Sequence, residues 1–117
     1  MRGGRPPRSR DEEIVEVFRA LSDPSRCRIV ELLRETGELR VGDIGKAFEM
    51  SLNAVSKHIK VLEGAGLVRR RREGTTHFIA MRPEGLDPVR VWLDAQKHKW
   101  ERRLDSLGRI LTDRNEE

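Results

Sequence analysis

Apolar residues recur three and four positions apart through the first half of the chain, a spacing that predicts amphipathic helices. A first helix is predicted from Asp11, which opens a run of three carboxylates suited to a helix N-terminus. A second is predicted from Pro24, with Asp23 as its cap and Gly37 at its end. A short third helix is predicted within residues 41–48. The apolar positions of the three are Ile14, Val17, Phe18 and Leu21, then Ile29, Val30, Leu32 and Leu33, then Val41, Ile44 and Phe48.

A fourth helix, residues 51–65, is predicted to have two chemically different faces. Ser51 is its expected N-cap, and Gly64 and Gly66 are expected to end it. The residues expected to form its buried stripe are Leu52, Val55, Ile59 and Leu62. The residues expected to share the opposite, solvent-exposed face are Asn53, Lys57 and Lys60.

The helical period then gives way to two short strands and a long helix. Residues 67–72 and 77–82 flank a turn containing Gly74, which predicts a β-hairpin. A final helix is predicted from about residue 88 to residue 111. Its stripe consists of Val89, Trp92, Leu93, Gln96, Trp100, Leu104, Leu107 and Leu111. The fold class is therefore mainly α with a small β-hairpin (α+β).

Composition sets the domain organisation. A length of 117 residues suits one compact domain, which we place at residues 11–112. Residues 1–10 hold four arginines and little to bury, so they are predicted to be a disordered basic arm, and residues 113–117 a frayed tail. No apolar run reaches the length of a membrane span, and we expect a cytoplasmic protein. Charged residues make up 38% of the chain with a net charge of +4, which favours a polyanionic partner.

Short helices followed by a basic hairpin predict a winged helix-turn-helix that binds double-stranded DNA. In this interpretation residues 51–65 form the recognition helix in a major groove, and residues 67–82 form the wing. Asn53 is the best candidate for reading a base, because its amide can bond adenine bidentately. The other residues expected at DNA are Ser51, Ala54, Ser56, Lys57 and Lys60 on the helix and Arg69, Arg70, Arg71, Arg72, Thr75 and Thr76 on the wing.

The final helix carries more apolar surface than the covering of one small core requires, which predicts a homodimer. The alternative is that Trp92 and Trp100 pack within one chain. The residues expected at the dimer interface are Val17, Leu21, Trp92, Leu93, Gln96, Trp100, Leu104, Leu107 and Leu111.

Two stretches resemble the ArsR-type (ArsR/SmtB) winged-helix repressors. They are FRALSDPSRCRIVELLRETGELRVGDIGKAF and MSLNAVSKHIKVLEGAGLVRRRREGTTHFIAM, and ALSDPSRCRIVELL is especially specific. The resemblance covers about residues 14–111. It implies a homodimeric transcriptional repressor that binds a palindromic operator and is released by an effector, which the sequence does not identify.

The usual sensor of that family is not found. Metal-sensing members carry a cysteine pair as E-L-C-V-C-D-L, whereas this chain reads ELRVGDI, with Arg40 and Gly42 at the thiolate positions. The chain thus resembles the branch without metal-ligand cysteines. Cys27 is a lone cysteine, and His98 with Glu101 lacks the companion ligands of a helix-borne metal site. We expect no metal and no cofactor.

Two alternatives to the interpretation as a repressor without a metal sensor remain open, and a third, an enzyme, is not expected. One is a metal- or redox-responsive repressor of the same family, and another is a winged helix that docks an acidic protein. An enzyme is not expected, because His58 and His77 lack a partnered acid or nucleophile and no phosphate loop, HExxH or GxSxG pattern occurs.

Overall fold

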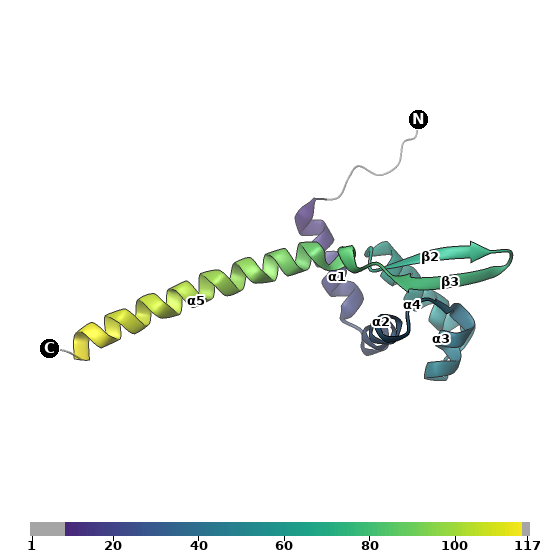
Figure 1. Cartoon of the computed structure of the whole chain (residues 1–117), viewed down its shortest axis with the longest axis horizontal. Coiled ribbons are helices and arrows are strands. Elements are labelled where there is room, and N and C mark those ends of the chain that lie inside the picture. The colour runs from purple at the N-terminus through teal and green to yellow at the C-terminus, as the bar shows by residue number, and fades with distance from the viewer. Residues whose placement is uncertain (1–8, 116–117) are drawn as a thin grey trace, which may run out of the picture.

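The computed structural model describes residues 9–115 and shows a helical body from which one long helix projects (Figure 1). The elements in chain order are α1 (Arg10–Leu21), α2 (Pro24–Thr36), β1 (Leu39–Arg40), α3 (Val41–Phe48), α4 (Leu52–Gly64), β2 (Val68–Glu73), β3 (Thr76–Met81), a 3-10 turn η1 (Pro83–Leu86) and α5 (Asp87–Asn115). The mainly helical fold with a β-hairpin, predicted from the sequence, is confirmed.

Side-chain caps determine where three helices begin. Ser9, Asp23 and Ser51 precede α1, α2 and α4, and each side chain accepts the backbone N–H three residues on at 3.1–3.2 Å. The caps at Asp23 and Ser51 were expected, whereas the cap at Ser9 was not, and it starts α1 at Arg10 instead of Asp11. The predicted basic arm therefore does not include residues 9 and 10, and residues 1–8 lie outside the described part of the chain.

The sheet has one more strand than the sequence predicted. β2 and β3 form the expected antiparallel hairpin, with Gly74 in the turn at a φ of 59° that favours glycine. β1 adds to the other edge of β3, giving the order β1-β3-β2 and placing Leu39 opposite Ile79. A two-residue strand offers no periodicity to detect, which is why the sequence pattern did not reveal β1.

A single apolar core lies beneath the sheet and between the first four helices. It consists of Ile14, Val17, Ala20, Ile29, Leu33, Ile44, Val55, Ile59, Leu62, Leu67, Val68, Ile79 and Val89. The chain returns close to itself where η1 meets the end of α4, because a Cβ on Gly85 would overlap the carbonyl oxygen of Gly66. The core and this contact fix α4 and the hairpin relative to each other.

Two residues were placed on the wrong surface by the sequence pattern. Val17, which was expected at a dimer interface, is 1% exposed inside the core of its own chain, so a partner cannot reach it. Leu52 was expected in the buried stripe of α4 but is 62% exposed, because neighbouring elements do not extend over the first turn of that helix.

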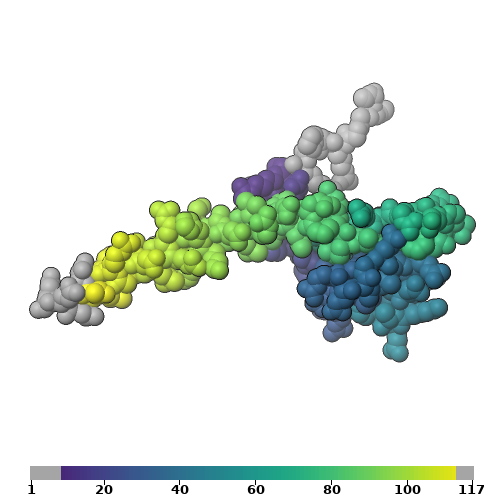
Figure 2. Space-filling model, viewed as in Figure 1, coloured from purple at the N-terminus to yellow at the C-terminus, as the bar shows by residue number. Residues whose placement is uncertain are grey.

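α5 extends far past the body, as the yellow-green helix in Figure 2 shows. Its helical backbone continues through residues 113–115, which were predicted to belong to a frayed tail, while residues 116–117 lie outside the described range. Trp92 packs edge-on against Phe18 of α1 with ring centroids 6.0 Å apart, so this tryptophan does pack within the chain. Trp100, which lies eight residues further along α5, is 62% exposed. Within residues 9–115, none of the helices has the length and apolar content to cross a membrane.

Candidate nucleic-acid interface

The outward face of α4 is polar and unobstructed. Val55, Ile59 and Leu62 are fully buried and anchor one side of the helix in the core. Asn53 and Lys57, together with Lys60 one turn on, are exposed on the opposite side, as the helical period predicts. An amide and two ammonium groups therefore project from a rigid helix with their donors free to meet another molecule.

The N-terminus of α4 adds a second set of donors. The Ser51 Oγ accepts the Ala54 N–H at 3.2 Å, which leaves the hydroxyl proton available for donation outward. The remaining amides of the first turn and the positive end of the helix dipole favour an anion at this point. Ala54 is half-buried, so its methyl group is partly accessible.

A groove of about 580 Å³ lies between α3, the start of α4 and the tip of the hairpin. The residues lining it that offer polar or apolar contacts to a ligand include Lys46, Leu52, Ser56, Thr75, Thr76 and His77. The groove thus joins Ser56 to the hairpin threonines, which the sequence had placed in one interface without showing that they share a cavity. Leu52 and Lys46 are candidate contacts that the sequence analysis missed, since one looked buried and the other lay outside the recognition helix.

Two of the four hairpin arginines are held by carboxylates of the same chain. Arg70 donates to both oxygens of Glu63 at 2.8 and 3.2 Å, and Glu63 comes from the last turn of α4. Arg71 donates to both oxygens of Glu38 at 2.6 and 3.1 Å and stacks 4.3 Å from the centroid of the Phe78 ring. These are bidentate pairs, the geometry in which a guanidinium binds a carboxylate most specifically.

These two ion pairs shift the pKa values of Arg70, Arg71 and Glu38. The hydrogen bond to Glu63 raises the pKa of Arg70, and the bonds to Glu38 and then Glu73 raise the pKa of Arg71. The Arg71 side chain in turn lowers the pKa of Glu38 below its ordinary value of 4.5. Arg70 and Arg71 therefore serve first to fasten the hairpin to the body.

Arg69 and Arg72 remain as the cations that the hairpin can offer outward. Both are exposed, and within residues 9–115 neither is bonded to a carboxylate as Arg70 and Arg71 are. The charge of Arg69 nevertheless helps to lower the pKa of Glu38, after the larger effect of Arg71. The Arg72 Nε donates to the Gly74 carbonyl at 2.6 Å, which leaves the terminal nitrogens of that guanidinium free. Successive strand residues alternate between faces, so Arg69 and Arg72 project from opposite faces of the hairpin.

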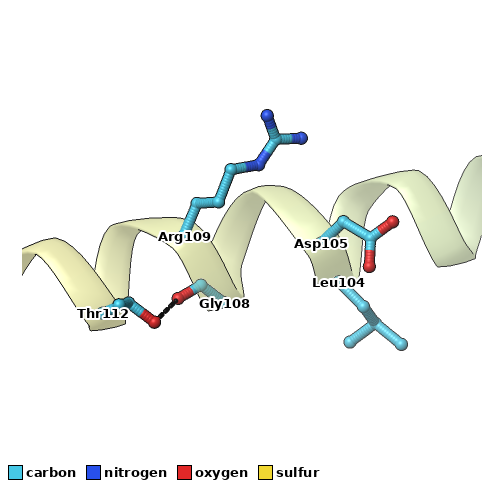
Figure 3. Close-up of a pocket in the computed structure, with 5 residues that line it drawn as sticks. All are labelled: Leu104, Asp105, Gly108, Arg109 and Thr112. Carbon is cyan, nitrogen blue, oxygen red and sulfur yellow. Dashed lines mark hydrogen bonds between the residues drawn. The ribbon is translucent and has the colours of Figure 1, made fainter.

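A second exposed surface is apolar and runs along α5. Leu93, Trp100, Leu104, Leu107 and Leu111 are each between 47% and 62% exposed. Figure 3 shows Leu104 projecting from one side of the helix and Arg109 from another, with the Thr112 hydroxyl bonded to the Gly108 carbonyl at 2.9 Å. Next to this stripe, α1 exposes Val15 and Phe18 by 50% and 44%. Leu21 and Trp92 are partly buried against the core, and Gln96 is exposed.

The residues that the sequence analysis considered as possible metal or redox sensors, Cys27, His98 and Glu101, do not form a common site. The Cys27 thiol is half-buried and donates to the Leu21 carbonyl at 3.0 Å. His98 is exposed on α5, and Glu101 lies 3.9 Å from the Lys97 ammonium. Among the described residues, no three histidine, cysteine, aspartate or glutamate side chains come together as a metal site would require.

Comparison with known proteins identifies the class of this arrangement. Residues 21–71 match the model of a helix-turn-helix domain. The HTH-type transcriptional regulator Rv2034 of Mycobacterium tuberculosis is 37% identical over 94 residues, which are 80% of this chain and 84% of the relative. The crystal structure of an ArsR family transcriptional regulator is 33% identical, with a TM-score of 0.72 over 78% of this chain and 93% of the other.

The chain belongs to the ArsR family of winged helix-turn-helix transcriptional regulators. A solved structure from Mycobacterium bovis, described as the homodimeric winged helix-turn-helix DNA-binding domain of a possible ArsR-family regulator, is 30% identical with a TM-score of 0.60. It covers 74% of this chain, and 82% of its own chain is matched. In this ArsR-family chain, α3 and α4 form the helix-turn-helix pair and the β2–β3 hairpin is the wing.

Proposed function

We propose that the chain is a homodimeric repressor that binds a palindromic operator in double-stranded DNA. The observation that carries this proposal is the exposed face of Asn53, Lys57 and Lys60 on α4, which stands beside a groove shared with the wing. A helix with one buried side and one projecting polar side can enter a major groove without disturbing the core.

Base reading falls to the first turns of α4. The Asn53 amide can donate to and accept from adenine, and Lys57 and Lys60 can reach guanine or the backbone. Leu52 supplies an exposed apolar surface at the edge of the groove that suits a thymine methyl group, in addition to the partly accessible methyl of Ala54.

Backbone contacts surround the base-reading face. Ser51 and the first amides of α4 can hold one phosphate, and Ser56 with Thr75 and Thr76 can hold another along the groove. Of the wing arginines, Arg69 and Arg72 meet phosphates, while Arg70 and Arg71 keep the wing in place through Glu63 and Glu38.

Dimerisation is proposed through α5 and the exposed part of α1. Trp100, Leu104, Leu107 and Leu111 follow one another at spacings of four, three and four residues, the pattern of a helix seam. The surface continues through Leu93 and Gln96 towards Leu21, Phe18 and Trp92, and Val17 no longer belongs to it. Two copies related by a twofold axis would present two α4 helices to two half-sites of a palindrome.

Repression follows from occupancy, because a dimer on an operator near a promoter keeps the polymerase off the same DNA. We place this activity in the cytoplasm. In this proposal the protein binds DNA without a cofactor. The effector that releases the repressor is not assigned.

The test is selection of bound duplexes from a random-sequence library by the purified full chain. The proposal predicts enrichment of a palindrome with two half-sites about one helical turn apart. Enrichment of no motif, with equal recovery of all duplexes, would refute base reading and would favour a basic face that docks an acidic protein.

A further inference from the structure

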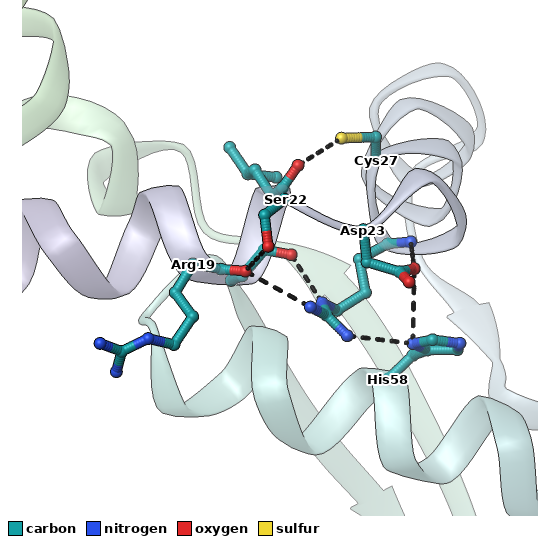
Figure 4. A network of polar contacts seen from close by, with 8 residues as sticks. Arg19, Ser22, Asp23, Cys27 and His58 are labelled. Carbon is teal, nitrogen blue, oxygen red and sulfur yellow. Dashed lines mark hydrogen bonds and ion pairs between the residues drawn. The ribbon is translucent and has the colours of Figure 1, made fainter.

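The corner between α1 and α2 makes a polar contact with the recognition helix. Ser22 and Asp23 form this corner, and α4 passes beside it with His58 facing it (Figure 4). His58 lies on the flank of α4 away from the groove, so it belongs neither to the base-reading face nor to the buried stripe. Its side chain is 21% exposed.

Arg26 of α2 is fixed to the end of α1 before it reaches α4. Its Nε donates to the Ala20 carbonyl at 2.6 Å and one terminal nitrogen donates to the Arg19 carbonyl at 3.3 Å. Both carbonyls belong to the last turn of α1, where backbone acceptors lack the usual helical partner. The Arg19 carbonyl also accepts the Ser22 N–H at 3.2 Å and the Ser22 hydroxyl at 2.6 Å. The guanidinium thus caps α1 in a defined orientation.

The other terminal nitrogen of Arg26 lies 3.5 Å from the Nδ1 of His58. Because a guanidinium only donates, this contact is a hydrogen bond in the tautomer of His58 whose Nδ1 carries no proton. The Asp23 Oδ2 lies 3.9 Å from the same nitrogen and also accepts the Arg26 backbone N–H at 3.1 Å, as the cap of α2. One polar cluster therefore joins the end of α1, the start of α2 and the middle of α4.

We infer that Arg26 and His58 are positioning residues that set the angle between α1 and the recognition helix, and thereby the half-site spacing that the dimer accepts. α1 carries part of the proposed dimer surface and α4 carries the base-reading face, so a change of angle at this corner moves both recognition helices relative to the twofold axis. The inference rests on the proposed function, because spacing has meaning only for a dimer on a palindrome. Added base pairs move the half-sites apart by about 3.4 Å each, a displacement that a rigid pair of helices cannot follow.

The experiment measures binding of each variant to palindromes that carry one base pair fewer, the same number, or one or two more between the half-sites. Arg26→Lys keeps the charge but loses the planar fork that bonds α1 and His58 together. His58→Leu removes the acceptor, while His58→Gln restores one on a side chain of similar size. Arg28→Lys is the matched control, since Arg28 is exposed on the same helix.

The wild type and Arg28→Lys are expected to prefer one spacing by about tenfold, the effect of about one mismatched base pair. Arg26→Lys and His58→Leu are expected to reduce this preference to about threefold or less, and His58→Gln to restore it. If Arg26→Lys fails to fold by circular dichroism, the two His58 variants decide the matter, because they leave the cap on α1 intact.

Two other results separate the inference from the proposed function. Variants that lose affinity equally at every spacing, with the wild-type preference intact, would reduce the cluster to a purely stabilising contact and overturn the inference alone. A wild-type protein that binds palindromes no better than random duplexes would overturn the proposed function, and the inference with it.

Discussion

At the scale of single residues, Leu52 and Asn53 illustrate how much the spacing of hydrophobic residues reveals about burial. The period places Asn53 on the open face of α4, and the side chain is exposed there. It also groups Leu52 with the buried stripe, although that side chain is 62% exposed. A period tells which residues share a face of a helix, but the extent to which neighbouring elements cover that face depends on tertiary packing.

Replacing Asn53 with alanine is expected to relax the choice of one or two base pairs in each half-site. Loss of a bidentate amide–adenine contact removes about 1–3 kcal/mol of discrimination and leaves the phosphate contacts in place. Fluorescence anisotropy against the selected operator and its single-base variants measures this. Equal weakening on operator and random duplexes would show that Asn53 does not read a base.

The four consecutive arginines look equivalent in the sequence and are different in the structure. Glu63 and Glu38, which bind Arg70 and Arg71, lie seven and 33 residues away along the chain. No local pattern indicates such pairings, because they depend on the packing of α4 and the α2–β1 loop against the sheet. The sequence therefore predicted the position of the hairpin correctly. It overestimated the number of hairpin arginines available to a partner, because Arg70 and Arg71 are paired with carboxylates of the same chain.

Arg72→Ala and Arg70→Ala are expected to differ in kind. Arg72→Ala should lower the dependence of log affinity on log salt by about 1 for each chain, on every sequence. Arg70→Ala should leave that slope unchanged and lower the free energy of unfolding, because Glu63 loses its partner. Salt titrations and thermal unfolding of both variants distinguish these effects, and the reverse assignment would contradict the geometry.

At the scale of elements, the wing is not a free hairpin, because β1 makes it part of a three-stranded sheet. β1 pairs with β3, and the Arg71–Glu38 pair ties β2 to the residue just before β1. The β-hairpin was predictable from Gly74 and the flanking alternation. β1 was not, because its two residues acquire a strand conformation only by pairing with β3.

The Glu38–Arg71 pair makes the stability of the wing depend on pH. The pKa of Glu38 is lower in the folded chain than its ordinary value of 4.5, because Arg71 donates to its carboxylate. The folded state therefore gains stability from this carboxylate above that value and loses it as the pH falls through the folded-state pKa.

Glu38→Gln is expected to be less stable than the wild type at neutral pH and to approach it as the pH falls below 4.5. Thermal unfolding midpoints of the two proteins across the acidic range test this. Asp23, whose pKa is also lowered, chiefly by its bond to the Arg26 N–H, is present in both proteins and cancels in the comparison. A difference between the two proteins that stayed constant with pH would contradict the assigned role of Glu38.

At the scale of the whole molecule, the length of α5 matters most. Its period predicted a helix and a stripe, and the helix runs on to Asn115 with the stripe exposed in the single chain from Leu93 onwards. Sequence reasoning could recognise excess apolar surface but could not separate Trp92, which packs on Phe18, from Trp100, which does not. That distinction depends on where α1 ends relative to α5.

Trp100→Ala is expected to weaken the dimer by about 2–4 kcal/mol, as loss of a large aromatic anchor at an interface does. Lys99→Ala, an exposed neighbour, is expected to leave the dimer unchanged. Sedimentation equilibrium measures both, and circular dichroism confirms that the helix persists. A monomeric wild type, or a Trp100→Ala dimer as tight as the wild type, would exclude this stripe as the interface.

A fluorescence-anisotropy titration tests most directly whether α4, the wing and the dimer seam form one DNA-binding surface. The full chain is titrated against the DNA upstream of its own gene, against the selected palindrome and against a shuffled duplex, at several salt concentrations. We predict tight binding to the palindrome that saturates at one dimer per site and weak, strongly salt-dependent binding to the shuffled duplex. Equal, weak binding to all three would contradict sequence-specific repression.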